Sequence, residues 1–405
     1  MQLFPYILAG WLLDGSAGPV QRKIFLEIKN GRIAVIRRAT EKDLAGGDLL
    51  DLSEHTLLPG LVDCHVHLSL SGSSDPSVRK GQLSASFSSA KEMISKHVAS
   101  NLCHGVVALR DGGDYGSHVL RYKREFLHEN KGTPDLKAAG KAWHAPGRYG
   151  RLVGRTPYRN CSLAQSILRG QKPIDHVKIV NSGLNSLVDF GKETSPQFSQ
   201  EDLRKAVLCA HHRGLKVMVH ANGRNPVSDA IEAGCDSIEH GFFMGRENLK
   251  RLAGKQITWV PTAFTMEAYS RMFPRGSRES EVARKNLDHQ IEQIRLARDF
   301  GVRMAVGTDA GSLGVHHGEA VREEIEFLVV AGLGLDEAVQ CATSKGAALL
   351  GLEDRAGRLV LGSPATFLAV RAEPERLLKA LGSPEKIYLK GVPIPPIHSE
   401  WRGES

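Results

Sequence analysis

Two kinds of hydrophobic pattern divide the chain. From about residue 60 to residue 350, short apolar runs of strand length alternate with longer stretches in which apolar residues recur every three or four positions. Repeated strand–helix units of this kind predict an α/β fold with a parallel sheet. About eight such units over some 250–300 residues indicate that the sheet closes on itself. We therefore expect a distorted (β/α)8 barrel of the TIM type over residues 59–351.

The expected elements of this region can be located one by one. The strand-like runs are GLVDCHVHL, GVVALRDGG, HVKIVNSG, LKVMVHANG, DSIEHGFFM, ITWVPTAF and VRMAVGTDAG. The helical stretches are SQEDLRKAVLCAHHRG, RKNLDHQIEQIRLARDFG and GLDEAVQCATSKGAALLG. Ser199 is expected to cap the first of these helices, and Gly214 is expected to end it.

Both ends of the chain have a different pattern, of short strands joined by turns. Residues 1–58 contain YILAGWLLDG and KIFLEIKNGRIAVIRR, and the Asn30-Gly31 pair in the second stretch is a strong hairpin signal. After residue 351 the strand pattern returns in AGRLVLG, ATFLAVR and KIYLKGVPI. We expect residues 1–58 and 352–405 to form one small β-sandwich domain beside the barrel.

Composition and charge narrow the possible partners and compartments. The formal net charge is +8, but no run of five or more Lys and Arg residues occurs, so we expect no nucleic-acid partner. The apolar start MQLFPYILAGWLLDG is interrupted after about a dozen residues, which is too short to span a bilayer, and we expect no membrane association. The six cysteines lie far apart without a CxxC pair. This usage fits a reducing compartment, so we expect a cytoplasmic protein.

Polar residues stand at the ends of the predicted strands, where a barrel of this type carries its functional groups. His65 and His67 are two residues apart, so they point to the same face of the first strand. Imidazole and carboxylate groups are ligands that divalent metals such as zinc accept. The polar residues at the strand ends are His65, His67, Lys178, His220, His240 and Asp309.

Each of these residues alone has an ordinary explanation. A buried histidine is usually a hydrogen-bonded core residue, Asp309 could cap a helix, and Lys178 could be a surface charge. Likewise, Arg110 and Asp111 in LRDGG are interpreted as an internal ion pair rather than as a catalytic pair. Several such groups at strand ends are costly to bury together unless they are paired or bind a metal. The joint pattern therefore predicts a metal site.

The sequence resembles the amidohydrolase superfamily of metal-dependent hydrolases over nearly its whole length. The matching segments are LLPGLVDCHVHL, HVKIVNSG, VMVHANG, DSIEHG, AVGTDAG and GLEDRAGRLVLGSPATFLAV. Within the superfamily, IEHG and the spacing of Lys178, His220 and His240 are most similar to the prolidase- and carboxypeptidase-like (imidazolonepropionase-like) branch. The resemblance implies that His65, His67 and Asp309 hold one divalent ion, and that His220 and His240 hold a second.

The resemblance also implies that Lys178 bridges two zinc ions after reaction with carbon dioxide. A lysine ammonium cannot ligate a cation, whereas the N-carboxylated side chain is an anionic oxygen donor. Burial and nearby cations lower the pKa of a lysine toward the neutral form that this reaction requires. The alternative is an uncarboxylated Lys178 that acts as an ion-pair partner in a site with one metal.

The implied reaction is hydrolysis of an amide, peptide or related C–N bond by a metal-activated hydroxide. Asp309 would accept the proton of the nucleophile and pass it to the leaving nitrogen, first as a general base and then as a general acid. The expected substrate is a small molecule, either an N-acyl amino acid or a dipeptide-like compound.

Two other functions stay open at this point. Ring deaminases with one metal usually carry a glutamate shortly after the fifth-strand histidine, whereas this chain has Asn222 and Gly223 there. A non-catalytic scaffold of the same fold should lack several ligands, and this chain has all six. The sequence leaves the oligomeric state open, a homo-oligomer included.

Candidate substrate-binding residues follow the third and the last predicted strands. The loop AWHAPGRYGRLVGRTPYRN contains His144, Arg148, Tyr149 and Arg155. An arginine fork in this loop would match a substrate carboxylate or phosphate, and the alternative is a solvated basic loop. His317 follows the last strand and either lines the site or faces water.

Overall fold

The computed structural model describes residues 5–16, 18–45, 48–127, 132–170 and 173–395. Over these ranges the chain forms mixed sheets with helices between the strands, so the predicted α/β class is confirmed. The first and last parts of the predicted terminal domain, residues 1–4 and 396–405, lie outside the described residues.

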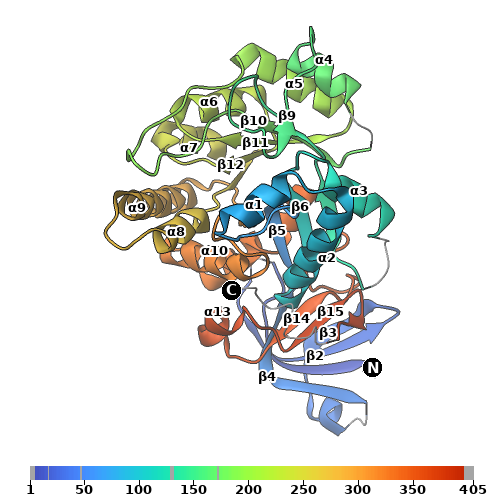
Figure 1. The fold of residues 1–405 in the computed structure, drawn as a ribbon. Coiled ribbons are helices and arrows are strands. Elements are labelled where there is room, and N and C mark those ends of the chain that lie inside the picture. The colour runs from blue at the N-terminus through green and yellow to red at the C-terminus, as the bar shows by residue number, and fades with distance from the viewer. Residues whose placement is uncertain (1–4, 17, 46–47, 128–131, 171–172, 396–405) are drawn as a thin grey trace.

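The two ends of the chain meet in one sheet, in which blue and red strands lie side by side (Figure 1). Among the described residues its order is β16-β15-β14-β4-β1-β2-β3. The strands are β1 (Tyr6–Leu12), β2 (Gln21–Lys29), β3 (Arg32–Arg38), β4 (Leu49–Pro59), β14 (Phe367–Val370), β15 (Lys386–Leu389) and β16 (Val392–Pro393). The N-terminal and C-terminal parts join where β14 runs antiparallel to β4.

The hairpin between β2 and β3 is confirmed. Asn30 and Gly31 have φ values of 53° and 76°, which are the left-handed conformations that a two-residue type I′ turn requires. A single sheet is what the topology records, so the second layer of a sandwich stays a prediction. The domain boundaries at residues 58 and 352 also stay predictions.

The strand β14 faces two different hydrophobic clusters. Phe367 and Ala369 belong to the cluster inside the terminal sheet, whereas Leu368 and Val370 belong to the main core of the molecule. This division follows from the strand geometry, because successive side chains point to opposite faces. The terminal sheet is therefore packed directly onto the rest of the fold.

The remaining strands pair parallel to one another. They are β5 (Leu61–Val66), β6 (Val106–Asp111), β7 (Asp135–Ala138), β8 (Ala142–Trp143), β9 (Gly154–Arg155), β10 (His176–Val180), β11 (Lys216–Ala221), β12 (Ser237–His240) and β13 (Thr258–Val260). In the described part of the chain they form two sheets, ordered β5-β6-β7 and β13-β12-β11-β10-β8-β9.

The predicted strand VRMAVGTDAG is not a continuous strand in the structure, and this expectation is corrected. Residues 303–310 contact both neighbouring strands through single bridges and hydrogen bonds. Ala305 N donates to Trp259 O of β13, and Cys64 N of β5 donates to Val306 O. Val306 N donates instead to Cys341 O, so the segment shares its backbone groups among three partners and forms no regular ladder.

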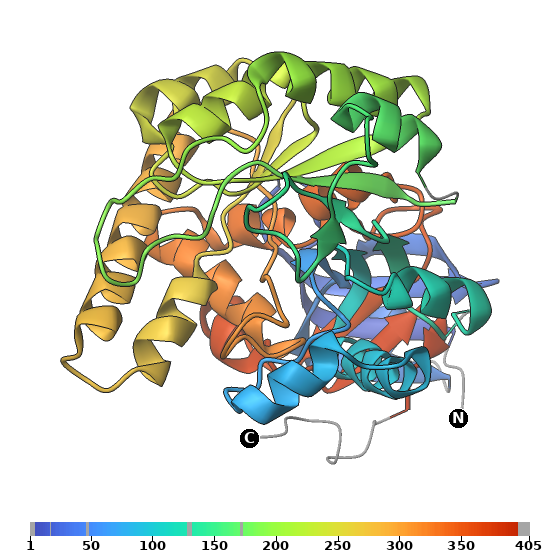
Figure 2. The ribbon, with the colours of Figure 1, turned by 45° about the horizontal axis from the view of Figure 1, so that its top comes forward.

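Helices lie around the outside of the parallel strands (Figure 2). They are α1 (Pro76–Leu83), α2 (Phe87–Cys103), α3 (His118–Glu125), α4 (Leu163–Arg169), α5 (Gln200–His212), α6 (Arg224–Ala233), α7 (Gly245–Ala253), α8 (Phe264–Met272), α9 (Arg278–Phe300), α10 (Glu319–Val330), α11 (Leu335–Cys341), α12 (Ser344–Leu350) and α13 (Leu377–Ala380). Short 3-10 turns cover Glu41–Ala45 and Pro374–Arg376. The stretch at residues 334–351, expected as one helical segment, is divided into α11 and α12.

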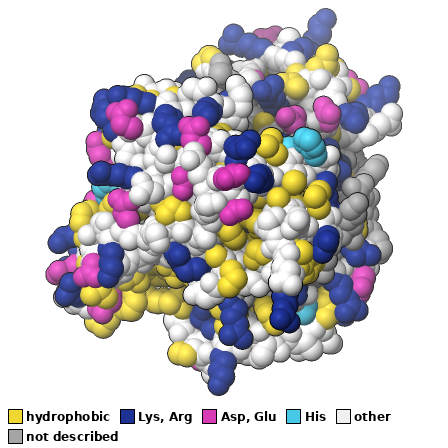
Figure 3. Space-filling model, turned by 90° about the horizontal axis from the view of Figure 1, so that it is seen from above, with side chains coloured by type: hydrophobic (Ala, Val, Ile, Leu, Met, Phe, Trp, Pro, Cys, Tyr) yellow, Lys and Arg dark blue, Asp and Glu magenta, His cyan; other side chains and the backbone are white. Residues whose placement is uncertain are grey.

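None of the helices in the described ranges combines the length and the apolar character needed to cross a membrane. On the face seen from above Figure 1, lysine and arginine side chains are dispersed among acidic and hydrophobic ones (Figure 3). The absence of a nucleic-acid partner stays a prediction.

Candidate metal centre

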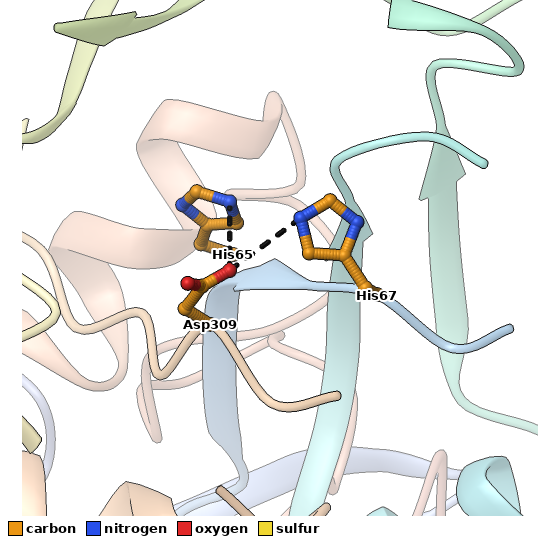
Figure 4. Close-up of side chains that lie close together, drawn as sticks. All are labelled: His65, His67 and Asp309. Carbon is orange, nitrogen blue, oxygen red and sulfur yellow. Dashed lines mark ion pairs between the residues drawn. The ribbon is translucent and has the colours of Figure 1, made fainter. Parts of the chain in front are cut away.

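His65, His67 and Asp309 point toward one another at the end of β5 (Figure 4). One ligand atom from each residue lies within 4.8 Å of the others. Asp309 Oδ1 is 3.4 Å from His65 Nε2 and also 3.4 Å from His67 Nε2. Two imidazole nitrogens and one carboxylate oxygen at these distances form a donor set that suits zinc or a similar divalent ion.

The other three predicted ligands adjoin this group. Lys178 Nζ of β10 is 3.2 Å from His65 Nε2. The ring of His240 lies 4.9 Å from that of His65 and 4.6 Å from that of His220, measured between centroids. The structure thus brings all six side chains into one cluster, whose members come from β5, β10, β11, β12 and the segment after β13.

Two members of the cluster have an uncommon backbone conformation. His240 has a φ of 69° and Asp309 has a φ of 58°, in the left-handed region that non-glycine residues rarely adopt. At His240 this conformation allows the side chains of two successive residues of β12 to point into the interior. A regular strand does not allow this, because its successive side chains point to opposite faces. Strain of this kind costs of order 1–3 kcal/mol per residue and is found preferentially at functional sites.

Hydrogen bonds orient three of the imidazoles. His67 Nδ1 lies 2.9 Å from the Gly113 carbonyl, His220 Nε2 lies 3.1 Å from the Gly183 carbonyl, and His240 Nδ1 lies 2.7 Å from Thr262 Oγ1. Because a carbonyl only accepts, each of the first two rings donates there and keeps its other nitrogen as a lone-pair donor.

Burial keeps the histidines of the cluster neutral. It lowers the pKa of His67 to about 4 and that of His220 to about 3, and it lowers the pKa values of His65 and His240 well below the usual range. A neutral imidazole is the form that ligates a metal. The histidines of the cluster are therefore ready to bind a cation at physiological pH.

Lys178 and Asp309 are also shifted toward their neutral forms. Burial lowers the pKa of Lys178 to about 8, and the carboxylates of Glu239 and Asp309 oppose this shift. Burial raises the pKa of Asp309 to about 6, against a hydrogen bond from Ser312. Ser312 Oγ donates to Asp309 Oδ2 at 2.8 Å, which leaves Oδ1 directed at the histidines.

Sequence reasoning missed Glu239, which lies beneath the cluster. Its Oε2 is 3.0 Å from His65 Nδ1, and its Oε1 accepts a hydrogen bond from Arg110 at 2.9 Å. The interpretation of Arg110 and Asp111 as an ion pair is therefore wrong: neighbours on β6 point to opposite faces, and Asp111 instead accepts a hydrogen bond from Leu68 N at 2.9 Å. The sequence signal that could have pointed to Glu239 was the glutamate of the IEHG motif.

Asp63 is a second buried acid that the sequence analysis did not single out. It accepts hydrogen bonds from Thr308 N at 3.0 Å, from Thr308 Oγ1 at 2.6 Å and from His65 N at 3.1 Å. These bonds fix the backbone of His65 relative to the segment that carries Asp309. Asp63 is thus a positioning residue for both.

Comparisons with known proteins agree with this geometry. Residues 56–393 match the family model described as the amidohydrolase family. The chain belongs to the amidohydrolase family. As a member it is a hydrolase that acts on C–N bonds, and its predicted placement in the prolidase-like branch is confirmed.

Several relatives cover nearly the whole chain of this amidohydrolase. The ochratoxinase of Aspergillus niger is 25% identical, over 94% of this chain and 84% of its own length. The imidazolonepropionase of Maricaulis maris is 26% identical, over 91% and 92%. A solved structure of a Xaa-Pro dipeptidase with methionine bound in its active site is 27% identical and superposes with a TM-score of 0.80, over 96% and 98%.

One of the predicted substrate residues of the amidohydrolase, Tyr149, lies near the cluster, and a second, His144, is buried. The Tyr149 ring is 5.6 Å from the His220 ring, between centroids. His144 is buried just after β8, and its Nδ1 lies 2.9 Å from the Ala145 carbonyl. Their roles toward a substrate stay predictions.

The two predicted arginines of the amidohydrolase are engaged elsewhere. Arg148 is exposed, and its Nη2 donates to the Ser195 carbonyl at 2.9 Å. The Arg155 guanidinium stacks on Trp143 at 4.3 Å and on Tyr158 at 4.9 Å from the ring centroids. Because these contacts already use both side chains, the structure does not bring them to the metal ligands.

His317 packs behind the segment that follows β5. Its ring stacks on that of His97 with 4.1 Å between centroids, and its Nε2 lies 2.9 Å from the Leu70 carbonyl. The side chain is buried. The expectation that it lines the substrate site stays a prediction.

Proposed function

We propose that this amidohydrolase is a metal-dependent enzyme that cleaves the amide or peptide bond of N-acyl amino acids or dipeptide-like substrates. The observation that carries the proposal is the convergence of four neutral imidazoles, one half-buried carboxylate and one buried lysine in a single cluster. Unpaired groups of this kind are costly to bury together, and bound cations offset that cost.

The surrounding fold is proposed to be a distorted TIM-type barrel of residues 59–351 beside a terminal β-sandwich domain of residues 1–58 and 352–405. Hydrogen bonds from residues 303–310 to both β13 and β5 support closure of the parallel strands. Functional groups at the carboxyl ends of the strands are the usual arrangement in this type of barrel.

Two divalent ions, zinc in the first instance, would be held by this chain's own donors. His65, His67 and Asp309 would hold one ion, and His220 and His240 would hold the other. Lys178 would join the two as an N-carboxylated side chain, since its lowered pKa makes the neutral amine available for reaction with carbon dioxide. When bound, the ions supply Lewis acidity, which lowers the pKa of water and polarises a carbonyl group.

Asp309 would move the proton of the reaction. Ser312 and the left-handed backbone hold the carboxylate so that Oδ1 faces the ligand histidines. At this oxygen the carboxylate would accept the proton of the attacking water and then donate it to the leaving nitrogen. The raised pKa of about 6 suits a group that must do both near neutral pH.

The relatives support a C–N bond in a small molecule as the target. By its name, one similar solved structure is that of an enzyme acting on Xaa-Pro dipeptides, and two other relatives are named imidazolonepropionase and ochratoxinase. A ring deaminase receives less support, because the Asn222 amide oxygen accepts a hydrogen bond from Phe242 N at 3.0 Å where a glutamate would be needed.

We place the enzyme in the cytoplasm. Within the described ranges, which contain all six cysteines, no disulfide bond joins them, as is usual in a reducing compartment.

The Asp309→Asn variant tests the proposed chemistry. It should keep the fold and lose at least about 100-fold in kcat, because the amide cannot accept the proton. Turnover should be measured with N-acyl amino acids and dipeptides of varied side chain, after titration with zinc to show stoichiometric binding. Full activity of the variant would refute the role of Asp309, and the absence of stoichiometric metal in the wild type would favour the scaffold.

A further inference from the structure

His65 lies between the ligand cluster and the buried carboxylate of Glu239. Its Nε2 faces the other ligands, 3.4 Å from Asp309 Oδ1 and 3.2 Å from Lys178 Nζ. Its Nδ1 faces away from them, and Glu239 Oε2 lies 3.0 Å from this nitrogen. The side chains of His65 and Glu239 are 1% and 0% exposed, so their contact is shielded from bulk water.

The two oxygens of Glu239 have different partners. Oε1 accepts hydrogen bonds from Arg110 Nη2 at 2.9 Å and from Ser237 Oγ. Oε2 faces His65 Nδ1, and no other group of the described residues forms a hydrogen bond with either of these two atoms. A buried polar atom without a partner is costly. The two atoms satisfy each other when the imidazole carries its proton on Nδ1.

Charge balance with Arg110 does not by itself explain this arrangement. Arginine and carboxylate groups that pair with each other frequently use two parallel hydrogen bonds, one to each oxygen. Here Arg110 reaches Glu239 through Nη2 only, because its Nε donates to the Cys64 carbonyl at 2.7 Å and its Nη1 donates to Ser237 Oγ at 2.9 Å. Arg110 therefore holds the backbone next to His65 and leaves one oxygen of Glu239 to the ring.

We propose that Glu239 is a positioning residue that keeps the proton of His65 on Nδ1 and thereby reserves Nε2 for a metal ion. A neutral imidazole has one N–H group and one lone pair, so the nitrogen that faces a fixed acceptor carries the proton. Carboxylates behind a metal-binding histidine fix its tautomer and the orientation of its ring. The inference rests on the metal centre of the proposed function and adds to it a residue that does not touch the ion.

Glu239→Gln should invert this hydrogen bond. Arg110 Nη2 and Ser237 Oγ both donate to the position of Oε1, so the amide oxygen of the glutamine should occupy it. The amide NH2 group then faces His65 Nδ1, which must accept a hydrogen bond, and the proton moves to Nε2. There the proton faces Asp309 Oδ1, and the lone pair that would bind the ion is lost.

The tautomer can be measured by nitrogen-15 NMR of the metal-free protein with labelled histidine, using His65→Gln to assign the signal. We expect a protonated Nδ1 in the wild type and in Arg110→Met, and a protonated Nε2 in E239Q. R110M breaks the same ion pair but leaves the carboxylate facing His65, so a role in charge balance alone would make the two variants alike. A protonated Nε2 in the wild type would overturn the inference, as would a protonated Nδ1 in E239Q.

The second measurement is the dissociation constant for zinc, obtained by competition with a chelator. His67→Ala identifies the step of the titration that belongs to the ion held by His65. E239Q should weaken that step by about 10- to 100-fold and the other step by less than about 3-fold, whereas R110M should change neither by more than about 3-fold. Equal losses at both steps in E239Q would indicate a structural role and overturn the inference.

Glu324→Gln is the matched control for the zinc titration. It makes the same substitution at another fully buried acid, which caps α8. Both steps should stay within about 3-fold of the wild type. Thermal unfolding of the metal-free variants shows whether each one folds. If E239Q does not fold, the tautomer of His65 in the wild type and in R110M decides the question.

The two measurements distinguish failure of this inference from failure of the proposed function. If the wild type binds no zinc, the proposed metal centre fails, but NMR of the metal-free protein still decides whether Glu239 holds the proton of His65. If zinc binds and E239Q keeps the affinity of the wild type, the metal centre stands and the role of Glu239 is refuted.

Discussion

Gly112 shows how closely the backbone approaches the ligand histidines. A Cβ atom at this position would lie 2.8 Å from His67 Cε1 and 3.3 Å from His65 Nε2. Real carbon–carbon contacts do not reach 2.8 Å, so either the ring or the backbone would have to move. The residue after β6 is therefore glycine because the imidazoles occupy the space of any side chain.

Gly112→Ala should weaken metal binding by about 10- to 100-fold, the range seen when the surroundings of a ligand are disturbed. The dissociation constant for zinc should be measured by competition with a chelator. Gly81→Ala is the matched control, since a Cβ there meets no atom within 4 Å and the position is inside α1. Unchanged zinc affinity in G112A would show that the histidines can shift without cost.

The limits of sequence reasoning are visible at the scale of single residues. His65, His67 and Asp309 were predictable because each follows an apolar run and has a side chain with metal-binding chemistry. Glu239 was not, since its role depends on a partner, Arg110, that lies more than a hundred residues away in the chain. Local pattern carries no information on such pairings.

At the scale of elements, local signals were reliable where the element depends on its own residues. The Ser199 side chain accepts a hydrogen bond from Asp202 N at 3.1 Å, and Gly214 has a φ of 69° just after α5. The break between α11 and α12 has a different origin. The Cys341 and Ala342 carbonyls accept hydrogen bonds from Val306 N and Val62 N, so distant backbone groups end α11.

Another element depends on a distant cap. The residue before α8, Ala263, has no side chain that can cap a helix, and Glu324 of α10 takes this role. Glu324 Oε1 accepts a hydrogen bond from Phe264 N at 2.7 Å. Burial raises the pKa of Glu324 from 4.5 to about 8, although the hydrogen bonds from the backbone oppose the shift.

The raised pKa of Glu324 predicts a pH dependence of stability. Between about pH 4.5 and pH 8 the folded state binds a proton that the unfolded state has released, so this group's contribution is complete at low pH and declines as the pH rises. Glu324→Gln removes the titration. In urea unfolding experiments, the midpoint concentration of E324Q should rise relative to that of the wild type as the pH increases from 5 to 8. Parallel profiles of the two proteins would contradict the shift.

At the scale of the whole molecule, the terminal sheet packs against the parallel strands, and we expect the two parts to unfold as one cooperative unit. The alternation along β14 places Phe367 in the core of the sheet and Leu368 in the main core. A Cβ at Gly105, just before β6, would lie 2.5 Å from Leu368 Cδ1, so the two parts of the fold are in direct contact. A substitution that destabilises the terminal sheet should therefore also destabilise the metal centre.

Phe367→Ala should lower the free energy of unfolding by about 3–5 kcal/mol, because it empties a fully buried position. Hydrogen exchange followed by mass spectrometry should show an equal loss of protection in β1 and in β11. Protection lost only in the strands of the terminal sheet would mean that the sheet unfolds as an independent domain.

The pairing of β4 with β14 also determines when the protein can finish folding during its synthesis. The ribosome makes β4 early, and its partner emerges some 300 residues later. At about 5–20 residues per second, the edge of β4 waits roughly 15–60 s for that partner. Through this interval a row of unsatisfied backbone groups is open to other nascent chains, and productive folding in the cell depends on keeping that edge covered until translation ends.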